Sequence, residues 1–446
     1  MIHPVEVLLA LVAVALVFAL LARHYGLPEP VALVIGGLLI GLQPWVPGIQ
    51  LDPQIVFLLF LPPLLYAAAF RTEWPDFRAQ LRAITLLAVG LVLFTTACVA
   101  AAAHYVAGLD WGPAFVLGAI VSPPDAVAAV AVTARLKVPK IITTILEGES
   151  LVNDASALVA LRVAVAAVAS GAFSLPDACA QFALVSAGGV AVGLVGGWAV
   201  VKLHAWLERS VHADAKFTIT VTLLTPYAVY LAAEHAHCSG VLAAVVAGLW
   251  VGNRCERVFS QALYEEARAV WEWIEFLLNA LIFILVGFAL RAILDNLSDR
   301  YPPDQLAYSA IAVVGAVIAS RLLWMFPGAY VPRLIDRALG SRVPFPRWQS
   351  VAVVGWTGMR GVVSLAAALA LPLTCDDKKT PFPGRDLIQF LTFWVIFGTL
   401  VVQGLTLPPL IRLLGVSREH DPAYDPANEF GESPDAPPDP PADISS

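Results

Sequence analysis

The chain has 446 residues, of which 59% are hydrophobic and 14% are charged, and its mean hydropathy is +0.77. This composition excludes a soluble globular protein and indicates an integral membrane protein. The net charge of −7 comes entirely from residues 417–446, which contain eight acidic residues and one basic residue. The chain has no basic stretch that would predict a nucleic-acid partner.

Thirteen apolar stretches follow one another along the chain, and we expect each of them to form a membrane-spanning helix. They are residues 5–22, 30–42, 55–70, 81–103, 111–134, 141–169, 179–201, 217–233, 241–251, 273–290, 306–330, 350–371 and 387–414. The second and the ninth are short for a bilayer, which needs about 20 apolar residues. The first lacks a basic n-region and a cleavage site, so we expect a retained helix.

Basic residues provide an independent check on this count. With thirteen spans, alternate sets of loops carry nineteen and five of the 27 Lys and Arg residues, and the remaining three lie within spans. The positive-inside rule then places the N-terminus outside and the C-terminus in the cytoplasm. We therefore expect a transmembrane domain at residues 1–416, followed by a disordered, acidic and proline-rich cytoplasmic tail at residues 417–446.

The thirteen spans divide into six, one and six. This division predicts two inverted six-helix repeats, about 5–169 and 217–414, joined by a linking span at 179–201. In the first repeat the fifth span is interrupted by Ser-Pro-Pro-Asp at 122–125, where two prolines should break the helix. In the second repeat the corresponding twelfth span contains Gly-Trp-Thr-Gly-Met-Arg-Gly at 355–361. We predict an all-α membrane protein with crossing broken helices, although such Pro and Gly residues also serve as simple kinks or packing positions.

Two aspartates lie near the middle of consecutive spans, Asp125 in the fifth and Asp154 in the sixth. A charged side chain at that depth costs roughly 2.5–3.5 kcal/mol, which indicates that the carboxylates have a function. At 100° per residue, Glu147 and Ser150 lie within about 40° of Asp154 on the same helix face.

Glu149 points about 140° away from that face and is a candidate partner for Arg360, which lies near the middle of the twelfth span. Arg360 is interpreted either as the structural partner of Glu149 or as a direct part of a transport site. Arg162 and Arg321 are closer to span ends, so we expect them to snorkel or to pack between helices.

These residues have the chemistry of a site that binds cations or protons. Hard monovalent cations prefer oxygen ligands, which Asp125, Asp154, Ser150 and the free carbonyl groups of a broken helix supply. Desolvation favours the protonated form of a carboxylate, so such a site holds a cation or a proton but never both. If the site alternates between the two sides of the membrane, it exchanges one for the other. The alternative is a structural network of hydrogen bonds between helices.

At these residues the chain resembles the monovalent cation/proton antiporters, the family of bacterial and eukaryotic sodium/proton exchangers. The resemblance runs from about residue 10 to 415 and rests on six ordered motifs: Leu-Pro-Pro-Leu-Leu at 61–65, Ser-Pro-Pro-Asp-Ala-Val at 122–127, Glu-Gly-Glu-Ser-Leu-Val-Asn-Asp at 147–154, Phe-Leu-Leu-Asn at 276–279, Gly-Met-Arg-Gly at 358–361 and Gln-Gly-Leu-Thr-Leu-Pro-Pro-Leu at 403–410. It implies a homodimeric transporter of a bacterial inner (plasma) membrane that exchanges sodium for protons, with no enzymatic activity and no cofactor.

Carried over by position, the resemblance makes Asp154 the cation- and proton-binding residue, with Asp125 and Ser150 as further sodium ligands. Asn153 resembles the first residue of the Asn-Asp pair that marks the branch regarded as electroneutral.

The resemblance also makes Glu149 and Arg360 a structural ion pair. Two positions depart from the family pattern. Pro124 stands where many relatives have a threonine hydroxyl, and Ala67 lies in a third-span segment where relatives often have an acid.

Three alternatives to sodium/proton exchange stay open. Potassium/proton exchange is compatible with the reduced set of ligands, and a channel would use similar residues, although broken helices favour alternating access. An intramembrane aspartyl protease also pairs two aspartates, but neither Asp125 nor Asp154 lies in the Gly-x-Gly-Asp motif of such enzymes.

Overall fold

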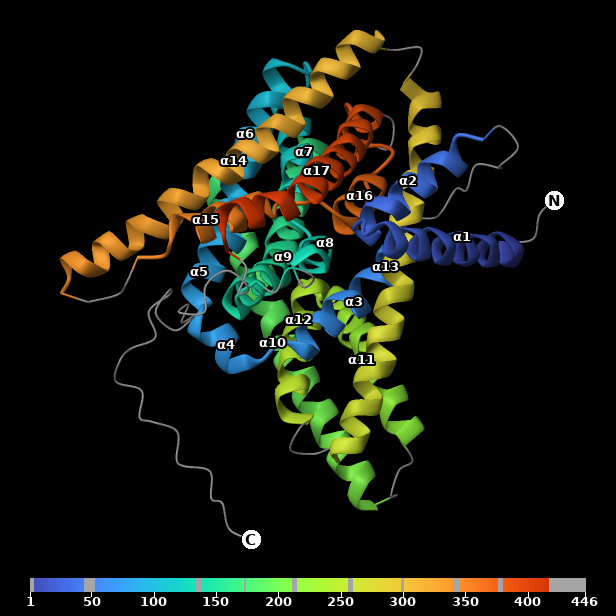
Figure 1. The fold of residues 1–446 in the computed structure, drawn as a ribbon, viewed down its shortest axis with the longest axis vertical. Coiled ribbons are helices and arrows are strands. Elements are labelled where there is room, and N and C mark those ends of the chain that lie inside the picture. Colours follow the sequence, from blue (N-terminus) through green and yellow to red (C-terminus); the bar gives the residue numbers. More distant parts are fainter. Residues whose placement is uncertain are drawn as a thin grey trace.

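The computed structural model describes residues 4–43, 53–133, 136, 138–171, 174–210, 215–255, 260–297, 301–340, 345–375 and 380–416, and these are almost entirely helical (Figure 1). The helices are α1 (Pro4–Tyr25), α2 (Glu29–Gly41), α3 (Pro53–Arg71), α4 (Trp74–Ala79), α5 (Leu81–Thr85), the π-helix η1 (Leu86–Leu91), α6 (Val92–Tyr105), α7 (Trp111–Val121), α8 (Ala126–Thr133), α9 (Lys140–Ser170), α10 (Leu175–Ser210), α11 (Ala215–His235), α12 (Gly240–Cys255), α13 (Gln261–Leu297), α14 (Pro303–Ala338), α15 (Trp348–Trp356), α16 (Val362–Leu369) and α17 (Arg385–Leu414).

Each of the thirteen predicted stretches coincides with one of these helices or with consecutive helices in line. In the part of the chain that the structure describes, eight helical segments are long and apolar enough to cross a membrane, and four further apolar helices are shorter. This pattern is that of a multi-pass membrane protein. The predicted tail at 417–446 lies outside the described residues, so its disorder stays a prediction.

Both predicted helix breaks are present. Residues 122–125 separate α7 from α8, and residues 357–361 separate α15 from α16. The first break follows from its two prolines, which cannot donate a backbone hydrogen bond. The two breaks also touch each other, since the backbone N–H of Asp125 donates to the carbonyl of Met359 at 2.7 Å. The two breaks are therefore in direct contact.

The helices pack in two groups around this meeting point. The broken helices pack with α6, α9, α14 and α17, and η1 packs against α6, α9 and α14. The helices α1, α2, α3, α10, α11, α12 and α13 pack mainly with one another. α9 joins the groups through contacts with α3, α10 and α12, and α17 does so through α2 and α13. The breaks therefore lie next to the boundary between the two groups.

Small residues bring α2 and α13 into close contact. A Cβ atom on Gly37 would overlap the backbone of Ile284, and one on Gly287 would overlap the backbone of α2. Such close backbone approach is typical of helices packed within a membrane, where van der Waals contact replaces the hydrophobic effect.

Some helices run well beyond the predicted apolar stretches. α14 has 36 residues where the apolar stretch has 25, because helical hydrogen bonding continues through the charged residues at its ends. Arg321 lies at the centre of α14 and is fully buried, so the expectation that it lies near a span end is wrong, whereas its burial agrees with the alternative expectation that it packs between helices. The π-helix η1 within residues 81–103 was not predicted either.

Candidate functional site

Asp125 lies between two helix N-termini that the breaks create. Its Oδ1 accepts the backbone N–H of Val127 at 2.8 Å and so caps α8. Its Oδ2 lies against Gly361, directly before α16, where a Cβ atom would overlap the carboxylate. The partial positive charge at helix N-termini stabilises an anion. The carboxylate of Asp125 therefore lies where two helix N-termini can stabilise negative charge.

Arg360 binds carbonyl groups at the C-terminal ends that the breaks create, opposite the N-termini near Asp125. The side chain is fully buried, and it donates from Nε to the carbonyl of Val121 at 2.9 Å and from Nη2 to that of Ser122 at 3.2 Å. It also donates from Nη1 to the carbonyl of Gly358. The last carbonyls of a helix have no partner within it and carry partial negative charge. Arg360 therefore neutralises the C-terminus of α7.

Glu149 forms its ion pair with Arg321 of α14. The two groups are bidentate, with Nη1–Oε1 at 2.5 Å and Nη2–Oε2 at 2.8 Å, and both side chains are 1% exposed. Arg321 also donates to the carbonyl of Val354, near the C-terminus of α15, at 3.1 and 3.3 Å. The expected pairing of Glu149 with Arg360 is thus wrong, because the length of α14 brings Arg321 to the depth of Glu149.

α9 is tied to the first break by the residues that precede Asp154. The hydroxyl of Ser150 accepts the backbone N–H of Ala126 at 3.3 Å. The amide of Asn153 donates to the carbonyl of Pro124 at 3.4 Å, while its Oδ1 is buried with no hydrogen-bond partner among the described residues. These contacts fix the position of Asp154 relative to Asp125.

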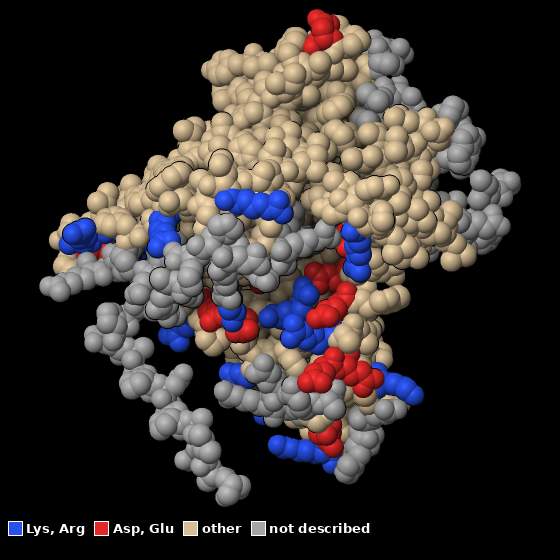
Figure 2. Space-filling model, in the orientation of Figure 1, with Lys and Arg blue, Asp and Glu red and all other residues tan. Residues whose placement is uncertain are grey.

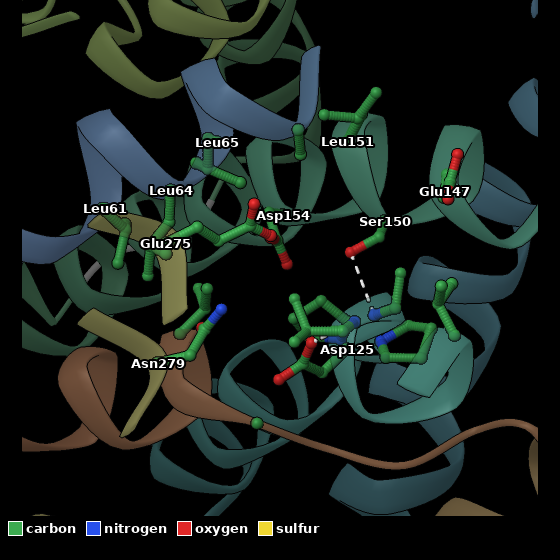
Figure 3. Close-up of a pocket in the computed structure, with 18 of the residues that line it drawn as sticks. Leu61, Leu64, Leu65, Asp125, Glu147, Ser150, Leu151, Asp154, Glu275 and Asn279 are labelled. Atoms are coloured by element: carbon green, nitrogen blue, oxygen red, sulfur yellow. Dashed lines mark hydrogen bonds between the residues drawn. The ribbon is translucent and has the colours of Figure 1, made fainter. Parts of the chain in front are cut away.

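Asp154 and Asp125 share a cavity of about 360 Å³. Figure 3 shows the two carboxylates, which come from different helices, directed into the same space. Asp154 is 5% exposed and accepts no hydrogen bond from the described part of the chain, and the two carboxylates repel each other. The remaining lining includes Pro123, Pro124, Ser150, Asn279, Gly361, Val363 and Ser364. A carboxylate without donors beside a second one is chemically suited to a cation or a proton.

Several polar residues that line this cavity were not predicted as site residues from the sequence. α13 contributes Glu275 and Asn279, and Glu275 forms an ion pair with Arg71 of α3, with Nη2–Oε2 at 2.5 Å. In Figure 2, charged side chains gather around a hollow near the centre of this face, whereas the upper part of the molecule shows almost none. Glu275 appeared to lie at the start of an apolar stretch, and the Phe-Leu-Leu-Asn motif at 276–279 was the available signal.

The two departures from the family pattern have clear consequences at this site. Ala67 lies away from the cavity, in a cluster with Phe70 and Trp271, while α3 lines the cavity with leucines and Ala68. Among the described residues, therefore, no acid of α3 lines the cavity. Pro124 lines it without a hydroxyl, although its carbonyl is held by Asn153.

A second polar contact involves Arg162, which lies on α9, C-terminal to Asp154. Arg162 donates from Nη2 to Glu234 of α11 at 2.5 Å and from Nη1 to the carbonyl of Cys238 at 3.5 Å. The pair is partly exposed and links α9 to α11, so Arg162 makes a contact between helices.

Known proteins are similar to this chain over most of its length. Residues 10–413 match the family model described as "Sodium/hydrogen exchanger, transmembrane". An uncharacterized Na⁺/H⁺ exchanger of Mycobacterium tuberculosis is 37% identical over 413 residues, which cover 91% of this chain and 74% of that protein. A sodium, potassium, lithium and rubidium/H⁺ antiporter of Bacillus subtilis is 32% identical over 394 residues, 86% of this chain and 58% of that protein.

Among solved structures, the sodium proton antiporter MjNhaP1 of Methanocaldococcus jannaschii has a similar fold. The TM-score is 0.70 at 19% sequence identity, and the match covers 92% of this chain and 98% of that one. The family model spans nearly all described helices, including both breaks and the cavity between them. The chain is therefore a member of the sodium/hydrogen exchanger family, whose members are transporters and not enzymes.

Proposed function

We propose that this monovalent cation/proton antiporter exchanges Na⁺ for H⁺, one for one, at a single site formed by Asp154 and Asp125. The observation that carries the proposal is the buried Asp154 carboxylate, which faces a cavity and accepts no hydrogen bond from the described residues. In one state of the transport cycle Na⁺ would bind the Asp154 carboxylate in place of hydrogen-bond donors. In the other state a proton would bind it. The aspartyl protease alternative is wrong, since the family consists of transporters.

The two carboxylates have different surroundings, and this difference supports different roles. Asp125 caps α8 and faces the N-terminus of α16, so it keeps its charge throughout the cycle. Asp154 has no such compensation and alternates between proton and cation. Ser150 adds a hydroxyl oxygen, and Asn153 holds the break in place. One titrating carboxylate for each cation makes the exchange electroneutral.

The arrangement of the breaks supports the inverted repeat. Arg360 binds the C-terminal carbonyls of α7, and Arg321 binds a carbonyl near the C-terminus of α15. In each broken helix, therefore, an arginine binds a carbonyl near the C-terminus of the first half. The N-terminus of the second half is directed toward Asp125. We extend this to thirteen spans in two inverted six-helix repeats about α10.

The cavity supports the proposed orientation, with the N-terminus outside and the C-terminus in the cytoplasm of an inner membrane. Arg71 and Arg268 line the cavity, at the end of α3 and within α13, and both were assigned from the sequence to the set of loops that carries most of the basic residues. The site would thus be open to the cytoplasm in this structure. A homodimer is proposed from the family resemblance alone.

The test is proton movement in proteoliposomes that contain the purified protein and a pH-sensitive dye. A pulse of Na⁺ should dissipate an imposed pH gradient, and titration with Na⁺, Li⁺ and K⁺ decides the cation. The Bacillus relative, which is named for four cations, makes K⁺ the main alternative. A K⁺–valinomycin clamp should leave Na⁺-driven proton movement unchanged. Absence of any cation-dependent proton movement by folded protein would contradict exchange, and a current that follows the membrane potential would contradict electroneutrality.

A second prediction concerns the closed side of the site. Arg162 lies eight residues, about 12 Å, beyond Asp154 on α9 and links that helix to Glu234 of α11. A cavity of about 470 Å³ on that side is lined by Arg162, Leu158 and Ala367. We expect the pair to break when the site opens outward.

Charge reversal tests this expectation. Glu234→Arg or Arg162→Glu alone should lower exchange severalfold, because each places like charges between α9 and α11. The double reversal should restore most of the activity, since it restores the pair with the opposite polarity. If the double variant is no better than either single variant, the pair does not control this side.

A further inference from the structure

The hydroxyl of Ser364 is buried and has no hydrogen-bond partner among the described residues. Ser364 lies on α16, directly after the second break, and is 1% exposed. Its Oγ forms no hydrogen bond with any residue that the structure describes. A buried polar group without a partner costs free energy, and native proteins retain few of them. Its presence therefore requires an explanation.

Ser364 lines the same cavity as Asp125 and Asp154. In the first repeat, the ligands of the proposed site come from the break before α8 and from α9. Ser364 is the hydroxyl that the second broken helix contributes, and it follows Gly361, which lies against the Asp125 carboxylate. Both sides of the meeting point of the breaks therefore contribute a hydroxyl-bearing residue to the lining of the cavity, Ser150 and Ser364.

Other expected oxygen ligands are missing or engaged. Pro124 has no hydroxyl, no acid of α3 lines the cavity among the described residues, and Ser150 already accepts the N–H of Ala126. Beside the two aspartates, the lining offers a cation the side-chain oxygens of Asn279 and Ser364 as neutral ligands that no other contact described above engages. A further neutral oxygen would complete the shell without changing the charge of the site.

We propose that Ser364 is a cation ligand, through which α16 takes part in binding the transported monovalent cation. The inference rests on the proposed function, because it assigns a further ligand to the same site. The hydroxyl, which has no hydrogen-bond partner among the described residues, donates a lone pair to the cation when the cation binds. Binding then connects α16 to α9, so that both broken helices sense the cation.

The experiment compares Ser364→Ala with Ser364→Thr and with a matched control, Ser156→Ala. Ser156 is a buried hydroxyl on α9 that donates to the carbonyl of Val152 at 3.1 Å and does not line the cavity. The measurements are the thermal unfolding temperature of purified full-length protein in NaCl, LiCl, KCl and choline chloride, and the cation dependence of exchange in proteoliposomes. A ligand that binds only the folded state raises the unfolding temperature.

In choline chloride, Ser364→Ala should be as stable as the wild type or more stable, because removing an unsatisfied buried hydroxyl relieves its desolvation penalty. The increase in unfolding temperature caused by the transported cation should be smaller in Ser364→Ala. The KM for that cation should rise about tenfold, as expected for the loss of one polar ligand, while the maximal rate stays near that of the wild type. Ser364→Thr keeps the hydroxyl and should restore the KM.

A purely structural role gives a different pattern. Ser364→Ala would then be less stable in choline chloride and would keep the full cation-dependent increase and the wild-type KM, which overturns the inference. An equal rise of KM in Ser156→Ala overturns it as well. Failure of the proposed function is distinguishable, because the wild type would then show cation-dependent stabilisation in detergent without cation-dependent proton movement in liposomes. Absence of cation-dependent stabilisation in the wild type contradicts both.

Discussion

Replacement of Asp154 by asparagine is expected to abolish cation/proton exchange and to leave the fold intact. The Asp154 carboxylate accepts no hydrogen bond from the described residues, so an amide of nearly the same shape disturbs no contact. The variant removes both the negative charge that attracts a cation and the group that carries the proton. Proton movement in proteoliposomes should fall to the background of protein-free vesicles, while size-exclusion elution and thermal unfolding stay unchanged.

Two further variants make this result specific. Asp125→Asn should also abolish exchange, and its amide oxygen still accepts the N–H of Val127, so that α8 keeps its cap. Glu147→Gln is the control, because Glu147 lines the same cavity and lies on the same face of α9 but is exposed at its mouth. It should retain most of the exchange. Normal transport by Asp154→Asn would show that the site assignment is wrong.

Replacement of Glu149 by glutamine should destabilise the protein strongly. Glu149 and Arg321 are 1% exposed and bidentate, so the variant leaves a buried guanidinium without its counter-charge. Removing one partner of a buried ion pair costs about 3–5 kcal/mol. The unfolding temperature in detergent should therefore fall by several degrees. Glu272→Gln is the control, since Glu272 pairs with Arg268 at an exposed position, where loss of a pair costs about 0.5 kcal/mol.

Double variants identify the partner of Glu149. When Glu149→Gln is combined with Arg321→Gln, the second substitution removes the stranded charge, so the combined loss of stability should be smaller than the sum of the two single losses. When it is combined with Arg360→Gln, the loss should be closer to additive, because Arg360 donates to backbone carbonyls. Strong coupling to Arg360 alone would contradict the structure.

The sequence was most informative where one residue type restricts its own backbone. Pro123 and Pro124 lack the N–H that a helix requires, so the break between α7 and α8 could be located without any tertiary structure. Apolar stretches likewise predicted where the helices lie, because a helix within a bilayer must satisfy its backbone internally and expose apolar side chains. The same burial argument selected Asp125 and Asp154, which the structure places in one cavity.

Pairing between helices was decided only by the tertiary structure. The partner of Glu149 depends on the rotation, depth and length of α14, and hydropathy underestimated that length because it stops at charged residues. For the same reason Glu275 appeared to lie at a helix end, although α13 begins fourteen residues earlier, at Gln261, and carries it into the cavity. The orphan hydroxyl of Ser364 has no local signature at all. Local residue type determined where helices form and break, whereas the contacts that neutralise buried charges depend on how separate helices pack.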